Sequence, residues 1–426
     1  MSILLGLIYA ATITSSCFAA SESKSSLLTV LQEAEENNPR LKAQEYEEKA
    51  AAENIRAKKS KYYPELNLAA IASTGNPGSF SMLEADGNLS SSQRVGYGTS
   101  LILKQDIWDF GRTSNGVHSA ELEKDLEKKK NDLTRTQVAS EVLATYIDCA
   151  FLRTQLENSG FIVEQARMLD NETDRFVRSG QKSVIERYLV DTEKKSAETR
   201  VAEFSERLRV AEERLGIQLQ RNAADPVHCD DLASMQKDVT NMNEAAKSNP
   251  VIEAQKVRAQ IAESKLSAAK SENMPRIFGM ALVGNFENEH LKERDHYAAG
   301  VGISLPLFSG FLVDAETGKR DAELLAERSS VEAIKQSVDT ANSNFDERIR
   351  SLQVRLRFLE SESQHARKVF DLAHKRYENL QGSMNDLRES IKNRDRLILE
   401  TDQTLRDLLY AEIEKDLFNG FQISKN

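Results

Sequence analysis

The chain has 426 residues and a mass of 47.8 kDa; 29% of its residues are charged, 6% are aromatic and only seven are proline. This composition is unusual for compact globular cores of that size and favours long helices. A net charge of −10, with basic and acidic residues interspersed, argues against a phosphate-binding surface and against nucleic acid as a partner.

The first twenty residues, MSILLGLIYAATITSSCFAA, form an apolar run that ends in small residues. Such a run predicts a signal peptide over 1–19, with cleavage before Ala20, and therefore export. Cys17 is an alternative, lipidated first residue, although Thr14 stands where such a site favours Leu. Beyond the signal there is no stretch of 18 or more apolar residues, so any membrane crossing has to be made by strands.

Two landmarks of the sequence occur twice. NPRLKAQ begins at Asn38 and NPVIEAQ at Asn249, and further prolines follow at Pro64 and Pro275, so both landmarks repeat at an offset of 211. In each copy an asparagine N-cap precedes a proline, and the next proline ends the helix, which predicts a helix of about 24 residues. This internal duplication divides the mature chain into repeat 1 (20–217), an equatorial linker (218–249) and repeat 2 (250–426).

Four segments alternate in polarity, which predicts β-strands. They are 65–73, 95–105, 277–286 and 297–305. In the third segment the apolar face is assigned to Phe278, Met280 and Leu282. Lengths of about 9 to 11 residues with aromatic residues at the boundaries are typical of transmembrane barrel strands. The candidate boundary aromatics are Trp108 and Phe308.

A half-buried antiparallel sheet would show the same alternation, but the helices that flank these strands leave no element to cover the apolar face. Four strands cannot close a barrel, and an open edge is not tolerated in lipid, so several copies must pool their strands. Two copies give eight strands, a barrel filled by its own side chains, whereas three give twelve and leave a lumen. We therefore expect a homotrimer.

Two long stretches without proline leave room for very long helices, because proline in a helix interior costs about 3 kcal/mol. The expected helices are 112–179 and 181–217 in repeat 1, and 311–381 and 383–418 in repeat 2. At 1.5 Å per residue the longer helices span about 100 Å. The shorter helices must stack end to end beside them, with the breaks midway along the rod.

Apolar residues in these helices recur every seven positions, which predicts left-handed supercoiling of packed helices. In repeat 2 nine successive sevens are occupied, by Leu324, Val331, Val338, Phe345, Leu352, Leu359, Ala366, Ala373 and Leu380. The helices therefore form coiled-coil walls and not a globular core.

Cys149 and Cys229 are the cysteines that remain in the mature chain. Cys149 falls at a helix position that is expected to be buried, and Cys229 falls in a polar loop. We therefore expect two free thiols and not a disulfide.

The sequence shows no pattern of catalysis or of metal binding. Two histidine-containing groups lack the helical or paired-cysteine spacing of a metal site, and there is no phosphate-binding glycine loop or nucleophile elbow. These groups are Glu289, His290, Asp295 and His296, and His228, Cys229 and Asp230. No catalytic residue, metal or cofactor is expected.

Several motifs together are characteristic: NPRLKAQ followed by YYPEL, the strand exit LKQDIWDFGR, the segment FVRSGQKSVIERYLVDTEKKSAET and the second NPVIEAQ with MPRI. Over essentially the whole mature chain the sequence resembles the TolC family of outer-membrane efflux and type I secretion channels. The resemblance implies a 12-stranded barrel shared by three protomers in the outer membrane, continued by a helical barrel across the periplasm. It also implies docking of a periplasmic adaptor, attached to an inner-membrane pump or ABC transporter.

The tip motif of that family is a glycine, then Ser or Thr three residues on, then an acidic residue at plus six. Gly180, Ser183 and Glu186 match it. In repeat 2 Gly382 is not followed by these residue types, which we attribute to a one-residue slip. The resemblance thus implies that the adaptor-docking tips are at Gly180, Ser183 and Gly382.

In the family an acidic ring constricts the periplasmic entrance. The candidates for that gate are Glu186, Asp386 and Glu389. A solvated helix face is the alternative interpretation of these carboxylates.

The leading functional hypothesis is a passive conduit that is opened by an adaptor. Efflux of small molecules and export of protein are not separated by the sequence. A soluble periplasmic coiled-coil adaptor or structural protein is the alternative, for which the seven-residue repeats suffice.

Overall fold

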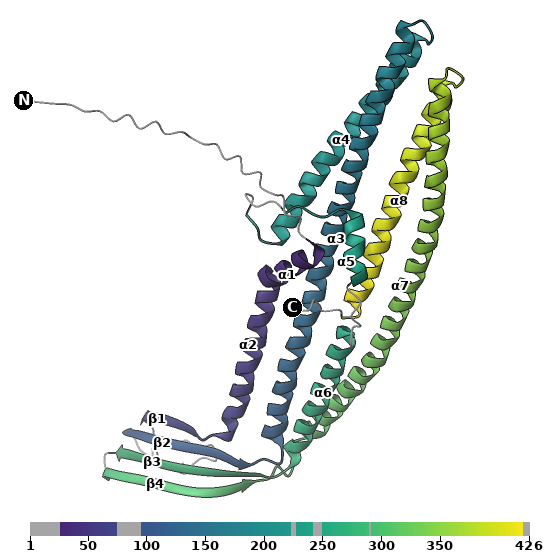
Figure 1. Ribbon diagram of the computed structural model, residues 1–426. Coiled ribbons are helices and arrows are strands. Elements are labelled where there is room, and N and C mark those ends of the chain that lie inside the picture. The colour runs from purple at the N-terminus through teal and green to yellow at the C-terminus, as the bar shows by residue number, and fades with distance from the viewer. Residues whose placement is uncertain (1–25, 75–94, 223–226, 242–248, 289–290, 421–426) are drawn as a thin grey trace, which may run out of the picture.

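The computed structural model describes residues 26–74, 95–222, 227–241, 249–288 and 291–420. The chain forms a long helical rod with a four-stranded sheet projecting from one end (Figure 1). At the other end, two tight turns each connect a long helix to a shorter one. The predicted fold class, mainly helical with a small β part, is confirmed. No helix in the described part of the chain is both long and apolar enough to cross a membrane.

The elements follow the same order in both repeats. Repeat 1 contains α1 (Leu27–Asn37), α2 (Pro39–Lys59), β1 (Glu65–Thr74), β2 (Val95–Trp108), α3 (Arg112–Arg178) and α4 (Val184–Gln218). Repeat 2 contains α6 (Pro250–Lys270), β3 (Arg276–Asn288), β4 (Leu291–Ser304), α7 (Leu312–Glu378) and α8 (Met384–Phe418). Two helices are not among the expected elements: α1 and, within the predicted linker, α5 (Leu232–Asn241).

Each long helix is accompanied along its length by two shorter ones (Figure 1). α2 and α4 lie end to end beside α3, and α6 and α8 lie end to end beside α7. The helices α2 and α6 begin as predicted: the side chains of Asn38 and Asn249 accept hydrogen bonds from the amides of Arg40 and Val251. α3 also packs against α6 and α8, so it joins the two repeats.

The largest hydrophobic core lies midway along the rod, where the short helices end. It combines α1, the middle of α3, the end of α4 and the last turns of α8. On α7 the predicted seven-residue series faces inward, and four of its members are fully buried: Leu324, Val338, Leu359 and Ala366. Leu380 is exposed, because α7 ends before it.

The sheet has the order β1-β2-β3-β4, and all neighbouring strands are antiparallel. β2 and β3 come from different repeats, so their pairing makes one sheet of two hairpins. β4 starts at Leu291, earlier than the predicted strand 297–305. Much of the interval between the two predicted strands is therefore strand, because pairing with β3 satisfies the backbone groups of charged residues as well.

The turns reveal the duplication in backbone geometry. The described chain contains eight residues with positive φ, which fall into four pairs 200 positions apart. The pairs are Phe110 and Gly310, Gly111 and Phe311, Gly180 and Leu380, and Gln220 and Gly420. Four of the eight are not glycine, although a side chain makes this conformation costly by about 1–2 kcal/mol. The two repeats have therefore kept the same turns with different residues.

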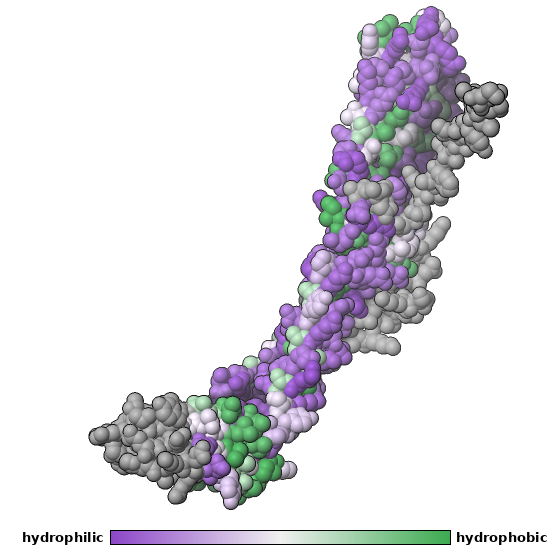
Figure 2. Space-filling model, turned by 90° about the vertical axis from the view of Figure 1, so that its left-hand side faces the viewer, coloured by the Kyte–Doolittle hydropathy of each residue, from purple (hydrophilic) through white to green (hydrophobic). Residues whose placement is uncertain are grey.

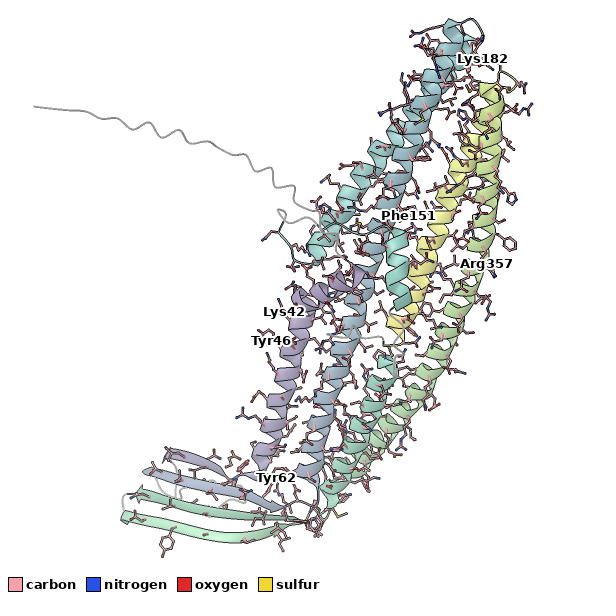
Figure 3. All side chains as sticks on the ribbon, viewed as in Figure 1. Lys42, Tyr46, Tyr62, Phe151, Lys182 and Arg357 are labelled. Carbon is pink, nitrogen blue, oxygen red and sulfur yellow. A yellow bond between two sulfur atoms is a disulfide. The ribbon has the colours of Figure 1, made fainter. Side chains whose placement is uncertain are left out.

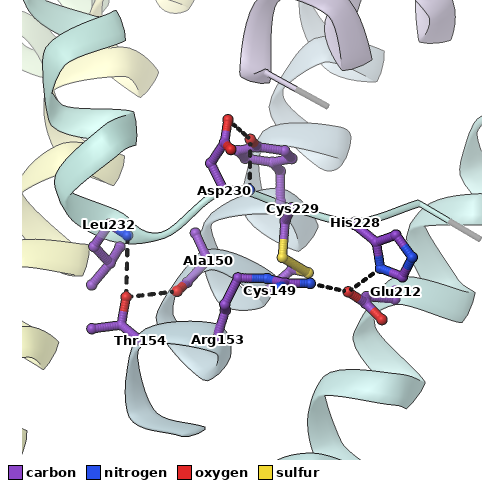
Figure 4. The surroundings of a disulfide bond; sticks show 10 residues. Cys149, Ala150, Arg153, Thr154, Glu212, His228, Cys229, Asp230 and Leu232 are labelled. Atoms are coloured by element: carbon purple, nitrogen blue, oxygen red, sulfur yellow. Dashed lines mark hydrogen bonds and ion pairs between the residues drawn. A yellow bond between two sulfur atoms is a disulfide. The ribbon is translucent and has the colours of Figure 1, made fainter. Parts of the chain in front are cut away.

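Cys149 and Cys229 form a disulfide, so the expectation of two free thiols is wrong (Figure 4). Both cysteines are completely buried. The polar sequence around Cys229 indicated an exposed loop, but this segment is held against the middle of α3. A disulfide agrees with an oxidising compartment and therefore with the predicted export.

Hydrogen bonds fix the segment that contains Cys229 along α3. The hydroxyl of Tyr146 donates to the carboxylate of Asp230 at 3.3 Å and accepts from the Asp230 amide at 3.2 Å. Further along, the amide of Leu232 donates to the hydroxyl of Thr154 at 3.1 Å. The polar residues of this segment thus have partners on α3, which is why the segment can be buried.

We expect the double substitution Cys149→Ser and Cys229→Ser to lower the melting temperature of the purified protein. The disulfide joins residues 80 positions apart, and closing a loop of that length contributes roughly 4 kcal/mol in the chain-entropy model. Thermal unfolding in detergent, followed by circular dichroism, measures the change. Wild-type protein treated with a reductant should approach the variant, and identical melting curves would contradict the stabilising role.

Candidate functional site

One face of the sheet carries large apolar side chains that no other element in the described part of the chain covers. Residues opposite one another in register share a face, and a continuous row crosses all four strands through Leu68, Leu101, Val283 and Tyr297. The two ends of the row, Leu68 and Tyr297, are 76% and 87% exposed. Hydrophobic residues gather at this end of the molecule, whereas the rod is mostly hydrophilic (Figure 2). A surface of this kind marks contact with a membrane or another chain.

The face assigned to β3 from the sequence is wrong. Phe278, Met280 and Leu282 lie on the opposite side of the sheet from the row, to which β3 contributes Val283. The ring of Phe278 lies over Gly302, where an added Cβ would come within 2.6 Å of it. Alternation could not identify the outer face, because both faces of β3 carry large apolar residues.

Trp108 and Phe308 lie where the sheet gives way to the long helices, and both are exposed. Each packs edge to face on a second aromatic ring, Trp108 on Phe110 at 6.0 Å and Phe308 on Phe311 at 5.4 Å between centroids. Aromatic residues of this kind are enriched at membrane–water boundaries. Their predicted role at such a boundary is compatible with this position and remains a prediction.

The opposite end of the rod, the tip, consists of two turns with corresponding geometry. One joins α3 to α4 and the other α7 to α8, 200 positions later. The hydroxyl of Ser183 accepts from the amide of Ile185, and that of Ser383 accepts from the amide of Asp386, each at 3.2 Å. Both serines therefore cap the helices that follow.

Gly382 is not the counterpart of Gly180, so the inferred one-residue slip does not occur. Gly382 takes the position of Lys182, and its amide donates to the carbonyl of Arg376 at 2.9 Å. An added Cβ there would lie 3.0 Å from the backbone nitrogen of Tyr377, so glycine is needed for close approach and not for positive φ. The counterparts of the tip motif in repeat 2 are Leu380, Ser383 and Asp386.

A network centred on Tyr377 joins the two turns of the tip. The hydroxyl of this buried residue donates to Glu186 Oε2 at 3.1 Å and lies 3.3 Å from the hydroxyl of Thr173. Lys182 donates to the carbonyl of Gly382 at 3.2 Å, and its Nζ lies 4.4 Å from the centre of the Tyr377 ring. Figure 3 places Lys182 at the end of the rod.

Burial raises the pKa of Tyr377 to about 12, and the negative charge of Glu186 acts in the same direction. The hydroxyl therefore stays protonated at neutral pH and can donate to Glu186. The two turns are thus joined by this hydrogen bond to a carboxylate and by the hydrogen bond from Lys182 to the carbonyl of Gly382. Within the first turn, Lys182 also pairs with Glu186 at 3.7 Å.

The three candidate gate carboxylates differ in their surroundings. Glu186 is engaged within the chain by Tyr377 and Lys182. Asp386 and Glu389 are exposed side chains near the start of α8. The structure therefore groups Glu186 with the contact between the turns and leaves the other two carboxylates at the surface.

Among the described residues, two groups bring together enough ligand atoms to hold a metal ion. In the first, Cys149 and Cys229 are already joined to each other beside Glu212. The second consists of Glu172 on α3 with His374 and Glu378 on α7. The sequence analysis missed this second group, although the spacing of four residues between His374 and Glu378 is a signal that could have revealed it.

Some predictions fall outside the described residues. They include the signal peptide over 1–19 with the lipidation candidate Cys17, and Glu289 and His290 of the first histidine-containing group.

Residues 30–216 match the model of a family described as outer membrane efflux protein. Among solved structures, VceC of Vibrio cholerae is similar with 16% identity and a TM-score of 0.73, covering 93% of this chain and 97% of that one. MtrE of Neisseria gonorrhoeae, solved in its open state, has 18% identity, a TM-score of 0.72 and coverages of 93% and 90%. CmeC of Campylobacter jejuni has 13% identity, a TM-score of 0.71 and coverages of 94% and 87%. No curated protein sequence matches the chain.

At these identities the structural likeness establishes the fold, which is that of the TolC-like outer-membrane channels. The match to the outer membrane efflux protein family covers most of repeat 1. This match and the likeness to outer-membrane channels agree on a place in the outer membrane with an extension into the periplasm.

We expect Tyr377→Phe to weaken the contact between the two turns of the tip. The change leaves Glu186 without its hydroxyl donor, and a hydrogen bond to a charged group contributes about 1.5–3 kcal/mol. The leak conductance of the purified protein in planar bilayers should rise. Tyr188→Phe, which removes an exposed hydroxyl from α4, is the matched control and should not change it. Equal conductance of the Tyr377 variant and wild type would contradict the role of this network.

Proposed function

We propose that three copies of this chain form one exit duct of a tripartite efflux pump or type I secretion system. The observation that carries the proposal is the exposed apolar row across a sheet of four strands, in which β1 and β4 are edge strands. An edge in lipid would leave backbone groups without partners, at several kcal/mol each. Each edge therefore needs a strand from another copy.

The number of strands supports closure between identical copies. Because all neighbours are antiparallel and the number is even, β4 of one copy runs antiparallel to β1 of the next. Three copies give twelve strands, which is the smallest multiple that leaves an open lumen. The apolar row then faces lipid all the way around the barrel.

The rod also carries apolar side chains that its own helices leave uncovered. Phe358 and Leu372 on α7, and Phe161 and Met168 on α3, are exposed. In a trimer the α7 and α3 helices of neighbouring copies would bury such residues, as the seven-residue pattern requires of a closed helical wall. The same assembly thus accounts for the exposed surface of both the sheet and the rod.

In this assembly the chain is a passive conduit, and its tip is the closable end. A periplasmic adaptor would dock at the turns around Gly180, Ser183 and Gly382 and separate them by breaking the contact at Tyr377. Energy and choice of cargo would come from an inner-membrane pump or ABC transporter. The cargo class, small molecules or protein, follows from that partner.

We assign the narrowing of the closed end to Asp386 and Glu389, because they are exposed near the tip while Glu186 is engaged within the chain. The double substitution Asp386→Ala and Glu389→Ala should increase leak conductance in planar bilayers and reduce cation selectivity, since a ring of negative charge attracts cations. An unchanged conductance and selectivity would remove these carboxylates as the gate.

Substitutions on the two faces of β4 test the barrel. Ala299 lies on the face of the apolar row and Ala298 on the opposite face, and both are exposed. Ala299→Lys would place a charge in lipid, which costs about 2–4 kcal/mol at the middle of the bilayer. We expect it to reduce recovery of the trimer from the outer-membrane fraction, whereas Ala298→Lys faces the lumen and should be tolerated.

The readout is the migration of heated and unheated samples on a denaturing gel after membrane fractionation. Wild-type protein should give a trimer that dissociates on heating. A freely dissolved monomer would overturn the proposed duct, and equal effects of the two lysine substitutions would contradict the orientation of the sheet.

A soluble coiled-coil adaptor or structural protein is not favoured. Such a protein would have to cover the apolar row, and no element in the described part of the chain does so.

A further inference from the structure

Three side chains with metal-binding atoms meet between the two long helices near the tip. Nε2 of His374 lies 3.3 Å from Oε2 of Glu172 and 4.0 Å from Oε1 of Glu378. The three ligand atoms all lie within 4.8 Å of one another. His374 and Glu378 are one turn apart on the same face of α7, and Glu172 projects from α3. The cluster therefore spans the two repeats.

This cluster lacks positive charge. In the described chain neither Glu172 nor Glu378 forms an ion pair with a lysine or arginine, and His374 is the basic partner of both. Nearby cations are engaged elsewhere, Lys182 with Glu186 and Arg394 with Asp395. The carboxylates of Glu172 and Glu378, whose oxygens lie within 4.8 Å of each other, repel each other. A proton on His374 or a cation between the three side chains would relieve that repulsion.

The distances suit a small tetrahedral ion. Zn²⁺ binds histidine nitrogen and carboxylate oxygen at about 2.0–2.2 Å, which places neighbouring ligand atoms roughly 3.3–3.6 Å apart. The separation of 3.3 Å between Glu172 and His374 lies in that range. Oε1 of Glu378, now 4.0 Å from Nε2 of His374, has to move toward the imidazole by roughly half an ångström. It can do so because its side chain is about half exposed at the end of α7.

The surroundings orient the imidazole and give access to it. The ring of Phe370 is stacked on His374, with 5.8 Å between centroids and 7° between planes, and the Arg394 guanidinium lies 4.1 Å from the Phe370 centroid. His374 also lines a cavity of about 250 Å³ between α3, α4, α7 and α8. That cavity is large enough for water, so a hydrated ion could enter and keep a water as its fourth ligand.

We propose that Glu172, His374 and Glu378 form a Zn²⁺ site that bridges α3 and α7. One nitrogen and two oxygen ligands with a water fit zinc better than calcium or magnesium, which prefer six or more oxygen ligands. The alternative is an ordinary ion pair of a protonated His374, which requires no metal. The site itself depends neither on the cargo nor on the trimer.

An ion at this site would also oppose separation of the two turns, because it ties α3 to α7 one turn from Tyr377. This consequence rests on the proposed opening of the tip. The effect on the tip is measured separately from zinc binding, so that a failure of the proposed opening is distinguishable from a failure of the proposed site.

Binding is tested with zinc chloride and the purified full-length protein without a histidine tag, in competition with a chromogenic zinc chelator. Wild type should bind one zinc ion per chain. His374→Gln and Glu172→Gln should each weaken the affinity at least tenfold. His365→Gln is the matched control, because His365 is an exposed residue of α7 whose Nδ1 lies 2.8 Å from the carbonyl of Ser361.

Equal zinc affinity of wild type and both site variants would overturn the proposal, as would an equal loss in the His365 variant. Cobalt provides a second readout. Wild type should show the intense visible bands of tetrahedral Co²⁺, and His374→Gln should lose them.

In planar bilayers zinc should lower the conductance of wild type and leave that of His374→Gln unchanged. Specific binding without this difference would establish the site and refute its effect on the tip.

Discussion

The antiparallel pairing of β2 with β3 is the interaction on which the rest of the structure depends. It joins a hairpin from each repeat into one sheet and aligns Leu101 with Val283, so that a single apolar row crosses all four strands. With another register the row would be interrupted, because the side chains of a strand alternate between its faces. α3 follows β2 directly, so this pairing places the start of α3 beside the second repeat.

The duplication is conserved more closely in backbone geometry than in sequence. Residues in the left-handed conformation occur in pairs 200 positions apart. In each pair one residue is glycine and the other is phenylalanine, leucine or glutamine. A turn of fixed shape can be built with different residues when the packed helices on either side determine its conformation. The two repeats can therefore diverge in side chains while their long helices stay parallel and equal in length.

The tip shows what this divergence produces. Tyr377, Lys182 and Glu186 belong to one network, but their counterparts in the other repeat are Val177, Gly382 and Asp386. The contact is therefore made once per chain, from Tyr377 of repeat 2 to Glu186 of repeat 1, and the counterpart residues do not repeat it. The pair of Glu172 and His374 likewise joins α3 to α7.

By itself the sequence determined the mainly helical class, the duplication, the caps at Asn38 and Asn249 and the inward series on α7. These features depend on proline positions and on periodicity along a single element, which a sequence displays directly. Only the tertiary structure decided the partner of Cys149, the outer face of β3, the place of Gly382 and the meeting of Glu172 with His374. Three of these are contacts between segments far apart in the chain, and the place of Gly382 is set by the conformation of its turn. Periodicity along one segment contains no information about its partner, because the register between elements is set by packing.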